Sequence, residues 1–376
     1  MSAAKPSNGG ILRTVQVLLA ERSYPIQLGT DILTEVGPEV ARCAPSGRAV
    51  VVTVPPVGRR YAPTVLRSLR GAGLRVHRLE VPDGDASKNL RQLKGLYDAL
   101  LDCGADRGTA VVALGGGVVG DLAGYAAASF LRGLPFVQIP TTVLAMVDAS
   151  IGGKVAVNLP QGKNLVGAFH QPEFVWIDIA TLRSLPPRQR SAGFAEMVKV
   201  AAIWDLELFE RLERDAEGLL ELDPALLLPA LERACAIKAE VVSRDERESD
   251  LRMLLNFGHT LGHAVEKLSR YRGVLHGEAV SMGMVAAARR SEALELSPRG
   301  TADRLAALLV RLKLPIELPD FPRKAYLEAL RVDKKKRASH IRYVVLKGIG
   351  RAETLPLEPG EIAPRAARRS RRPRRA

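Results

Sequence analysis

The stretch Thr109-Ala-Val-Val-Ala-Leu-Gly-Gly-Gly-Val-Val-Gly-Asp121 joins an apolar run to a cluster of glycines. The apolar run predicts a buried strand, and the glycines predict a tight turn into a helix. Gly115, Gly117 and Gly120 match the pattern G-x-G-x-x-G, which lets a backbone approach a diphosphate at a helix N-terminus. Such glycines also serve close packing alone, and no acidic residue follows about 20 positions later to hold a ribose hydroxyl. The stretch therefore predicts a strand, a turn and a helix, and leaves the ligand open.

Strand-like and helical segments alternate on both sides of this unit. Leucines at helical spacing run from Leu90 until Gly104, and the further strand-like runs are Ala49–Val54, Leu74–Val81, Phe136–Ile139 and Phe174–Ile179. This alternation predicts an α/β domain with a mostly parallel, Rossmann-like sheet. Ligands of such sheets gather beyond the carboxyl ends of the strands.

The strand signal nearly vanishes after Leu185-Pro186-Pro187. Helical periodicity takes over from Gln189 to about Lys313, and His340–Lys347 followed by Gly348-Ile349-Gly350 predicts a late strand and turn. We therefore predict an α/β domain over residues 1–182, a mainly α-helical C-terminal domain over 183–360, and a basic tail over 361–376.

The composition is that of an ordinary globular protein, with 376 residues, 47% hydrophobic and 26% charged. No apolar stretch is long enough to predict a membrane span, and Met1–Ala20 lacks the apolar core of a secretory signal, so we expect a cytoplasmic protein. The three cysteines, Cys43, Cys103 and Cys235, are far apart and indicate neither a disulfide framework nor a cysteine zinc site.

The formal net charge of +14 is concentrated at the C-terminus. Seven arginines fall in the last twelve residues, so the rest of the chain carries +7. A segment with so many like charges and no apolar residue able to pack is expected to be disordered. It could contact nucleic acid or an anionic surface, but we do not expect it to define the function.

Polar residues gather in the segment that follows the fourth predicted strand. Pro140–Lys154 and Gly162–Asn164 place two lysines, an asparagine, an aspartate and two threonines among glycines. A solvated surface loop is the usual explanation for a lone lysine. Here apolar neighbours such as Ile151 and Val155 favour instead a site for a phosphorylated ligand.

The helical half carries a polar stripe. If Leu251–Leu268 is one helix, then Arg252, Asn256, His259 and His263 lie within about 60° of one another on it. A single inward histidine is more often a hydrogen-bonded core residue than a ligand, but two histidines with arginine and asparagine on one stripe favour a site.

Two more helices contribute charged residues. Lys238 shares the apolar face of a helix that starts at Asp223-Pro224, so it needs a partner or an anion. Glu196 and Lys199 share a helix face and by default form an ordinary salt bridge. Glu196 together with two or three imidazoles, from His259, His263 and His276, is a credible set for a divalent metal.

Six longer strings carry a resemblance to a known family. They are GGGVVGD (Gly115–Asp121), PTTVLAMVDASIGGK (Pro140–Lys154), GKNLVGAFHQP (Gly162–Pro172), FAEMVK (Phe194–Lys199), LNFGHTLGH (Leu255–His263) and LHGE (Leu275–Glu278). Together they resemble 3-dehydroquinate synthases of the shikimate pathway, and the resemblance extends from about Val15 to Pro356. It implies a lyase that converts 3-deoxy-D-arabino-heptulosonate 7-phosphate into 3-dehydroquinate and phosphate by transient oxidation, elimination, re-reduction and aldol closure.

The resemblance implies a tightly bound NAD and a zinc or cobalt ion. The metal ligands would be Glu196, His259 and His276, and His263 would face the substrate instead. The NAD-binding residues would be Asp83, Gly84, Asp85, Lys88, Gly115, Gly116, Gly117, Val118, Val119, Gly120, Asp121, Thr141, Thr142, Asp148, Lys154, Lys163, Thr181, Leu182, Arg183 and Ser184.

The resemblance also implies how the substrate is held. The phosphate end would meet Lys154, Asn164, Asn256, His263 and one of Lys334 or Lys335. The hydroxyls and carboxylate would meet Lys199, Lys238 and Arg252, and Arg132 would reach the neighbouring site across a homodimer interface. Two positions depart from the family pattern: Asp85 stands where glutamate is usual, and Ala149 replaces the common serine.

Three other functions compete with this one. A different sugar phosphate cyclase, of the 2-deoxy-scyllo-inosose or 2-epi-5-epi-valiolone synthase type, would take a neutral sugar phosphate, against which Arg252 and Lys238 argue. A metal-dependent alcohol dehydrogenase related to glycerol dehydrogenase would release NADH, and Lys154, Lys163 and Asn164 argue against it. A non-enzymatic nucleic-acid binder rests on the arginine tail alone.

Overall fold

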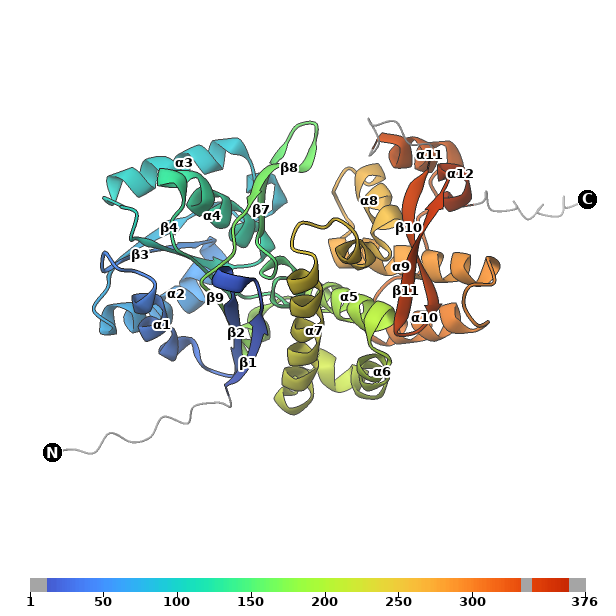
Figure 1. Ribbon diagram of the computed structural model, residues 1–376, viewed down its shortest axis with the longest axis horizontal. Helices are drawn as coiled ribbons and strands as arrows, with labels where there is room; N and C mark the ends of the chain where they lie inside the picture. Colours follow the sequence, from blue (N-terminus) through green and yellow to red (C-terminus); the bar gives the residue numbers. More distant parts are fainter. Residues whose placement is uncertain (1–11, 333–339, 365–376) are drawn as a thin grey trace, which may run out of the picture.

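The computed structural model describes residues 12–332 and 340–364. Its two halves lie side by side along the longest axis, with the α/β half carrying the N-terminus and the helical half the C-terminus (Figure 1). Over the described ranges, the α/β half is built on a seven-stranded sheet in the order β1-β2-β9-β6-β5-β3-β4. β1 pairs antiparallel with β2, and all other neighbours are parallel. The fold class predicted from the sequence is therefore confirmed.

The strands of the large sheet follow the predicted runs closely. Their bounds are β1 Arg13–Val17, β2 Tyr24–Gly29, β3 Arg48–Thr53, β4 Arg75–Glu80, β5 Ala110–Gly115, β6 Phe136–Pro140 and β9 Phe174–Asp178. The runs behind β3, β4, β5, β6 and β9 were predicted to within a residue or two at each end. β1 and β2 were not predicted as strands.

Helices cover both faces of this sheet. The β5 residues Ala110 and Val112 pack with α1 (Val36–Arg42) and α2 (Pro55–Gly71), whereas Val111 and Ala113 pack with α3 (Leu90–Asp102) and α4 (Gly117–Ser129). Alternate side chains of one strand thus enter two different cores, as a strand buried on both faces requires. This double cover explains why the central strands are continuous apolar runs.

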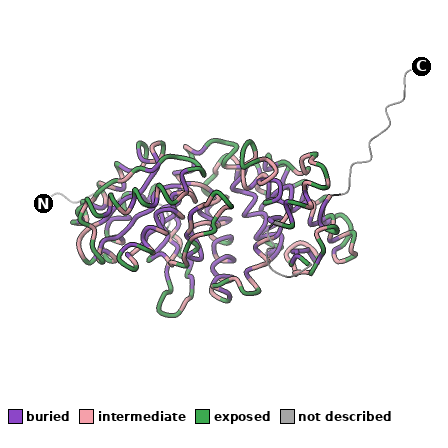
Figure 2. The backbone as a smooth tube through the Cα atoms, turned by 90° about the horizontal axis from the view of Figure 1, so that it is seen from above, coloured by how far each residue is buried: buried purple, intermediate pink, exposed green. Residues whose placement is uncertain are grey.

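The helical half packs directly against the β1 end of the sheet. Its elements are α5 Pro187–Trp204, α6 Leu206–Leu220, α7 Pro224–Arg244, α8 His259–Leu268, α9 His276–Ala293, α10 Thr301–Arg311, α11 Arg323–Val332 and α12 Pro359–Ile362, with the hairpin β10 Ile341–Gly348 and β11 Arg351–Leu357. One core cluster contains β2, β9 and most of these helices. Buried segments accordingly run through both halves in Figure 2. The predicted late strand and turn are confirmed as the first strand and the turn of the β10–β11 hairpin.

One local prediction was wrong, and one hairpin was not predicted. Leu251–Leu268 is not one helix, because a short 3-10 helix, Leu251–Asn256, ends before Gly258, which adopts a left-handed φ of 78° and caps α8. The residues around Lys154 and Lys163 form an antiparallel hairpin, β7 (Lys154–Leu159) and β8 (Gly162–Phe169), which was not predicted. This hairpin rises from the α/β half on the side that faces the helical half in Figure 1. In both places, local apolar periodicity did not reveal the turn geometry.

Candidate active site

Three helices of the C-terminal half bring a carboxylate and two imidazoles together. Glu196 lies on α5, His259 begins α8 and His276 begins α9. The Glu196 Oε1 atom is 3.6 Å from His259 Nε2 and 3.7 Å from His276 Nε2. The three residues form one of two groups in the described residues whose ligand atoms all lie within 4.8 Å of one another. The metal set predicted from the sequence thus converges in space.

Glycines allow these helices to approach so closely. A Cβ atom on Gly277 would lie 1.7 Å from the backbone oxygen of Ala192 on α5, and one on Gly283 would lie 2.0 Å from the oxygen of Gly258. The backbones of α5 and α9, and of α9 and the turn before α8, therefore touch at positions where only glycine fits. His276 directly precedes the first contact, so this contact sets its distance from Glu196.

The Nδ1 atom of each imidazole, which faces away from Glu196, lies near a hydrogen-bond acceptor. His259 Nδ1 lies 3.2 Å from the backbone oxygen of Phe257, and His276 Nδ1 lies 3.4 Å from Glu266 Oε2. Protons on the Nδ1 atoms leave both Nε2 lone pairs directed at Glu196. Burial, aided by the Lys199 cation, lowers the pKa of His259 well below its ordinary value, so this ring is neutral and able to bind a metal.

This donor set suits a divalent metal. Two atoms that each lie about 2.1 Å from a tetrahedral ion are about 3.4 Å apart, close to the separations found here. Glu196 is 1% exposed, and its Oε1 accepts no hydrogen bond from any residue in the described ranges. A buried carboxylate oxygen without a donor is costly unless a cation binds it, so the residues present fit zinc or a similar ion.

A cluster of buried charges lies next to the trio. The ammonium group of Lys199 pairs with Glu196, and that of Lys238 pairs with Asp148 and its backbone oxygen. Both lysines are at least 96% buried. Burial lowers the pKa of Lys238 to about 8, although Asp148 opposes the shift. Burial acts against ionisation of Asp148, but Lys238 and Lys199 outweigh it and lower the pKa of Asp148 strongly.

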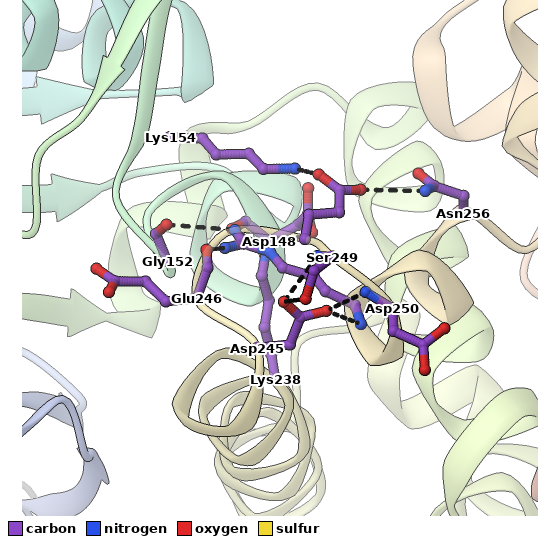
Figure 3. A network of polar contacts seen from close by, with 11 residues as sticks. Asp148, Gly152, Lys154, Lys238, Asp245, Glu246, Ser249, Asp250 and Asn256 are labelled. Atoms are coloured by element: carbon purple, nitrogen blue, oxygen red, sulfur yellow. Dashed lines mark hydrogen bonds and ion pairs between the residues drawn. The ribbon is translucent and has the colours of Figure 1, made fainter.

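Arg252 is fixed by a loop that joins α7 to the 3-10 helix. Asp245 accepts hydrogen bonds from the backbone nitrogens of Ser249, Asp250 and Arg252 at 2.8, 2.9 and 3.0 Å. The Arg252 guanidinium in turn donates to the backbone oxygens of Glu246 at 2.6 Å and Gly152 at 3.2 Å. Figure 3 shows this network above the end of α7. The arginine is 3% exposed and is held between the two halves of the molecule.

Glu248, in the same loop, joins two of the predicted phosphate ligands. Its carboxylate pairs with Lys154 from β7 and accepts a hydrogen bond of 3.1 Å from Asn256 Nδ2 (Figure 3). Burial acts against ionisation of Glu248, but the hydrogen bond and charge of Lys154 lower its pKa. The structure therefore brings Lys154 of the α/β half and Asn256 of the helical half to the same carboxylate. Glu248 was not predicted from the sequence, because the charged run DERESD is typical of a solvated turn.

Two family models match consecutive parts of the chain. Residues 78–192 match the model described as 3-dehydroquinate synthase N-terminal, and residues 193–336 match the model described as 3-dehydroquinate synthase C-terminal. A 3-dehydroquinate synthase of Geotalea uraniireducens is 50% identical over 339 residues, which cover 90% of this chain and 94% of the relative. The chain belongs to the 3-dehydroquinate synthase family. A further 3-dehydroquinate synthase, from Synechococcus, is 47% identical over 343 residues, with 89% of this chain and 93% of the relative covered.

Solved structures of related cyclases share the fold. A 2-deoxy-scyllo-inosose synthase in complex with carbaglucose-6-phosphate, NAD+ and Co2+ superposes with a TM-score of 0.85 at 29% identity, covering 93% of this chain and 98% of that one. A 2-epi-5-epi-valiolone synthase from Streptomyces hygroscopicus with NAD+ and Zn2+ gives 0.84 at 30% identity, covering 92% and 96%. The 3-dehydroquinate synthase relatives are clearly more similar in sequence than either cyclase.

The glycine turn expected to hold the cofactor in 3-dehydroquinate synthases lies at the carboxyl end of β5. Gly116 caps α4, which starts at Gly117, and a Cβ atom on Gly120 would lie 2.7 Å from Gln138 Oε1. Thr141 and Thr142 follow β6, the neighbouring strand, and Thr142 Oγ1 accepts from the nitrogen of Ala145 at 3.1 Å. Both stretches thus reach the same edge of the sheet, where a ligand of a parallel sheet is expected.

The other predicted cofactor residues of the α/β half contact one another and the hairpin. Lys88, 4% exposed, bonds to Asp121 and to Asn164, so Asn164 meets this lysine rather than the Glu248 group. Lys163 Nζ lies 3.3 Å from Asp85 and 3.3 Å from Glu266 of α8. The shorter Asp85 side chain, a departure from the 3-dehydroquinate synthase pattern, still reaches a cation.

The remaining predicted residues are less closely connected. Thr181–Ser184 forms part of a 3-10 helix, in which Leu182 is fully buried and the Ser184 hydroxyl accepts from Tyr61 at 2.7 Å. Arg132 is exposed and has a positive φ of 69°. His263 lies 5.3 Å from His259, centroid to centroid. Lys334, Lys335 and the arginine tail lie outside the described residues. Within residues 12–332 and 340–364, none of the helices is both long and apolar enough to cross a bilayer.

Proposed function

We propose that this chain catalyses the 3-dehydroquinate synthase reaction, in which 3-deoxy-D-arabino-heptulosonate 7-phosphate loses phosphate and closes to 3-dehydroquinate. The observation that carries this proposal is the convergence of Glu196, His259 and His276 beside buried lysine and arginine cations, in a chain about 50% identical to relatives of that name. The cytoplasm, where we place the protein, fits a chain with free cysteines.

Both implied cofactors have residues suited to them. A metal on Glu196, His259 and His276 would supply Lewis-acid polarisation of substrate hydroxyls, and NAD at the Gly115–Asp121 turn would supply a reversible hydride acceptor. The turn fits a diphosphate because its glycines expose backbone N–H groups at the start of α4. Lys88, Asp121 and Lys163 would complete this nucleotide site.

The charges of the site match a substrate with two anionic ends. Lys199, Lys238 and Arg252 supply buried cations near the metal trio, where a carboxylate would be drawn. Lys154 and Asn256, held by Glu248, together with His263, would meet the phosphate end. Holding both ends fixes the carbon chain between them, and positioning of this kind lowers a barrier by up to about 7–11 kcal/mol.

The same residues suit the order of bond changes. A ketone at C5 makes the C6 proton acidic, so that this proton and the phosphate can leave, after which the ketone is reduced again and the ring closes by aldol addition. The carbon that is oxidised is later reduced by the same hydride, so the overall reaction involves no net oxidation. Lys199 and Lys238 are 1% and 4% exposed, so bulk water has little access to these groups, beside which the ketone would form.

Turnover of the heptulosonate phosphate tests the proposal directly. We expect purified protein loaded with zinc and NAD to release phosphate and dehydroquinate in equal amounts, with no accumulation of NADH absorbance. D-Glucose 6-phosphate, whose sugar part has no carboxylate, should give no phosphate release. Accumulating NADH would instead identify a dehydrogenase, and turnover of glucose 6-phosphate alone would identify another cyclase.

A homodimer completes the proposed enzyme. Arg132 follows a residue, Leu131, that is itself exposed and has a positive φ of 49°, so this strained turn holds an apolar and a cationic side chain at the surface. In a dimer it would contribute the arginine to the neighbouring site. Sedimentation of the wild-type protein and of Arg132→Ala, with activity measured on both, tests this: a dimer with lower activity is expected for the variant.

A further inference from the structure

Glu266 is a buried carboxylate outside the proposed metal trio. It lies on α8, seven residues after His259, and is 5% exposed. Its Oε2 lies 3.4 Å from His276 Nδ1, and its Oε1 lies 3.3 Å from Lys163 Nζ. Both oxygens therefore have partners, and the partners come from α9 and from the β8 strand of the other half.

The imidazole of His276 bridges two carboxylates. Its Nε2 faces Glu196 Oε1 at 3.7 Å, while its Nδ1 faces Glu266. A histidine that gives Nε2 to a metal keeps its proton on Nδ1, and a carboxylate that accepts this proton orients the ring and increases its basicity as a ligand. His259 has a backbone oxygen in the same role, so a side chain controls only one of the two rings.

We propose that Glu266 is a positioning residue of the metal site, which holds His276 in the orientation and tautomer that bind the ion. This inference rests on the proposed function, because it presumes the metal on Glu196, His259 and His276. Lys163 contacts the Glu266 oxygen that does not face His276, and it also contacts Asp85. A row of polar contacts therefore leads from Asp85 in the α/β half to His276.

Glu266 must be distinguished from a metal ligand. His263, Glu266 and His276 form the second group of possible ligands in the described part of the chain. Two observations favour the positioning role. Lys163 already places a cation on Glu266 Oε1, and Glu196 Oε1 has no hydrogen-bond donor in the described residues, whereas both oxygens of Glu266 are engaged.

Zinc release from the loaded protein tests the role without reference to turnover. Zinc-loaded wild type, Glu266→Gln and Glu266→Leu would be mixed with a chromophoric chelator, and the release rate would be followed. Glu266→Gln keeps an acceptor oxygen but loses the charge, so we expect release about tenfold faster; Glu266→Leu loses both, so we expect up to about 100-fold. Glu217→Gln is the control, because it removes a carboxylate of α6 that pairs with Arg311 of α10. Its release rate should match that of the wild type.

Cobalt spectra separate positioning from ligation. With Co2+ in place of zinc, Glu266→Gln should keep the intensity of the visible bands, because the ligand set is unchanged, whereas Glu196→Gln should lose it. Release at the wild-type rate from both Glu266 variants would overturn the positioning role. Loss of metal from Glu266→Gln as complete as from Glu196→Gln would make Glu266 a ligand and also overturn it. A wild type that holds no zinc would instead overturn the proposed metal site itself.

Discussion

The two halves of the molecule differ in where their polar side chains lie and in how far these side chains are exposed. In the α/β half, the residues proposed for the nucleotide follow strand ends and glycine turns, and their exposure is mixed: Lys88 is 4% exposed, whereas the side chains of Lys163 and Asp85 are 31% and 47% exposed. In the helical half, Glu196, Lys199, Lys238 and Arg252 lie within the packed interior and are 1–4% exposed. Buried charges oppose folding unless they are paired or bind a ligand, so their density marks the helical half as the place of the chemistry.

The largest expected effect lies in the helical half. His276→Ala should remove a metal ligand and lower kcat by about 1,000-fold or more, because a metal contributes several kcal/mol of transition-state stabilisation. Metal content and kcat would be measured together. His77→Ala, an exposed imidazole of β4 in the other half, is the matched control and should change neither. Unchanged metal content in His276→Ala would contradict the ligand assignment.

Glycine to alanine changes should have opposite effects in the two halves. Gly277→Ala places a methyl group against the Ala192 oxygen and should reduce the free energy of unfolding by about 3 kcal/mol, with weaker metal binding. Gly95→Ala, inside α3 with no atom within 4 Å of the new Cβ, should stabilise the protein by about 0.5–1 kcal/mol. Denaturant unfolding measures both. Equal effects would mean that the close contact of α5 and α9 is not what positions His276.

Arg252→Ala should act mainly on substrate binding. Loss of a charge-assisted hydrogen bond is worth about 1.5–3 kcal/mol, so KM should rise about 10- to 100-fold while kcat falls less. Arg244→Ala, which removes an exposed arginine paired with Glu240 on α7, is the control and should leave KM unchanged. An unaltered KM in Arg252→Ala would remove this residue from the carboxylate site.

The smallest graded effect is a dependence on pH. Because the pKa of Lys238 is about 8, the side chain is a cation below that pH and becomes neutral above it. Loss of the cation weakens attraction for an anionic substrate, so kcat/KM should fall by up to about tenfold per pH unit above 8. Lys238→Gln should show a lower value without this limb. A limb near pH 8 that persists in the variant would assign it to another group.

Deletion of residues 365–376 should have no effect on turnover. The tail carries seven arginines but none of the residues proposed for the site. Steady-state kinetics on the truncated protein, with addition of RNA as a second condition, checks this. A loss of activity on truncation would make the tail part of the function and would revive the nucleic-acid alternative.

Much of the α/β half could be predicted because its signals are local. The apolar runs behind β3, β5 and β6 are buried on both faces, so each is continuous in the sequence, and Gly115–Gly120 marks the turn directly. β1, at the edge of the sheet, and β2, its neighbour, were missed because their burial alternates along the strand, so neither is a continuous apolar run. The hairpin β7–β8 was missed because its lysines and glycines are typical of a loop.

In the helical half, less of the site could be predicted from the sequence. Glu196, His259 and His276 were predicted, but the spacing argument that first connected His259 with Arg252 assumed one helix, which Gly258 interrupts. Glu248 and Glu266 gave no signal, since one lies in a charged run and the other in an amphipathic helix. Their roles depend on Lys154 and on His276, which are 94 and 10 residues away in the chain.

The sequence by itself determined the alternation of strands and helices in most of the α/β half, the glycine turn after β5 and the residues of the candidate metal trio, because these follow from local patterns and from residue type. The tertiary structure decided which nitrogen of each imidazole faces Glu196, which carboxylates hold Lys154 and His276, and how closely α5 and α9 approach. These features arise only when segments far apart in the chain pack together, since hydrogen bonds and close contacts act over a few ångströms.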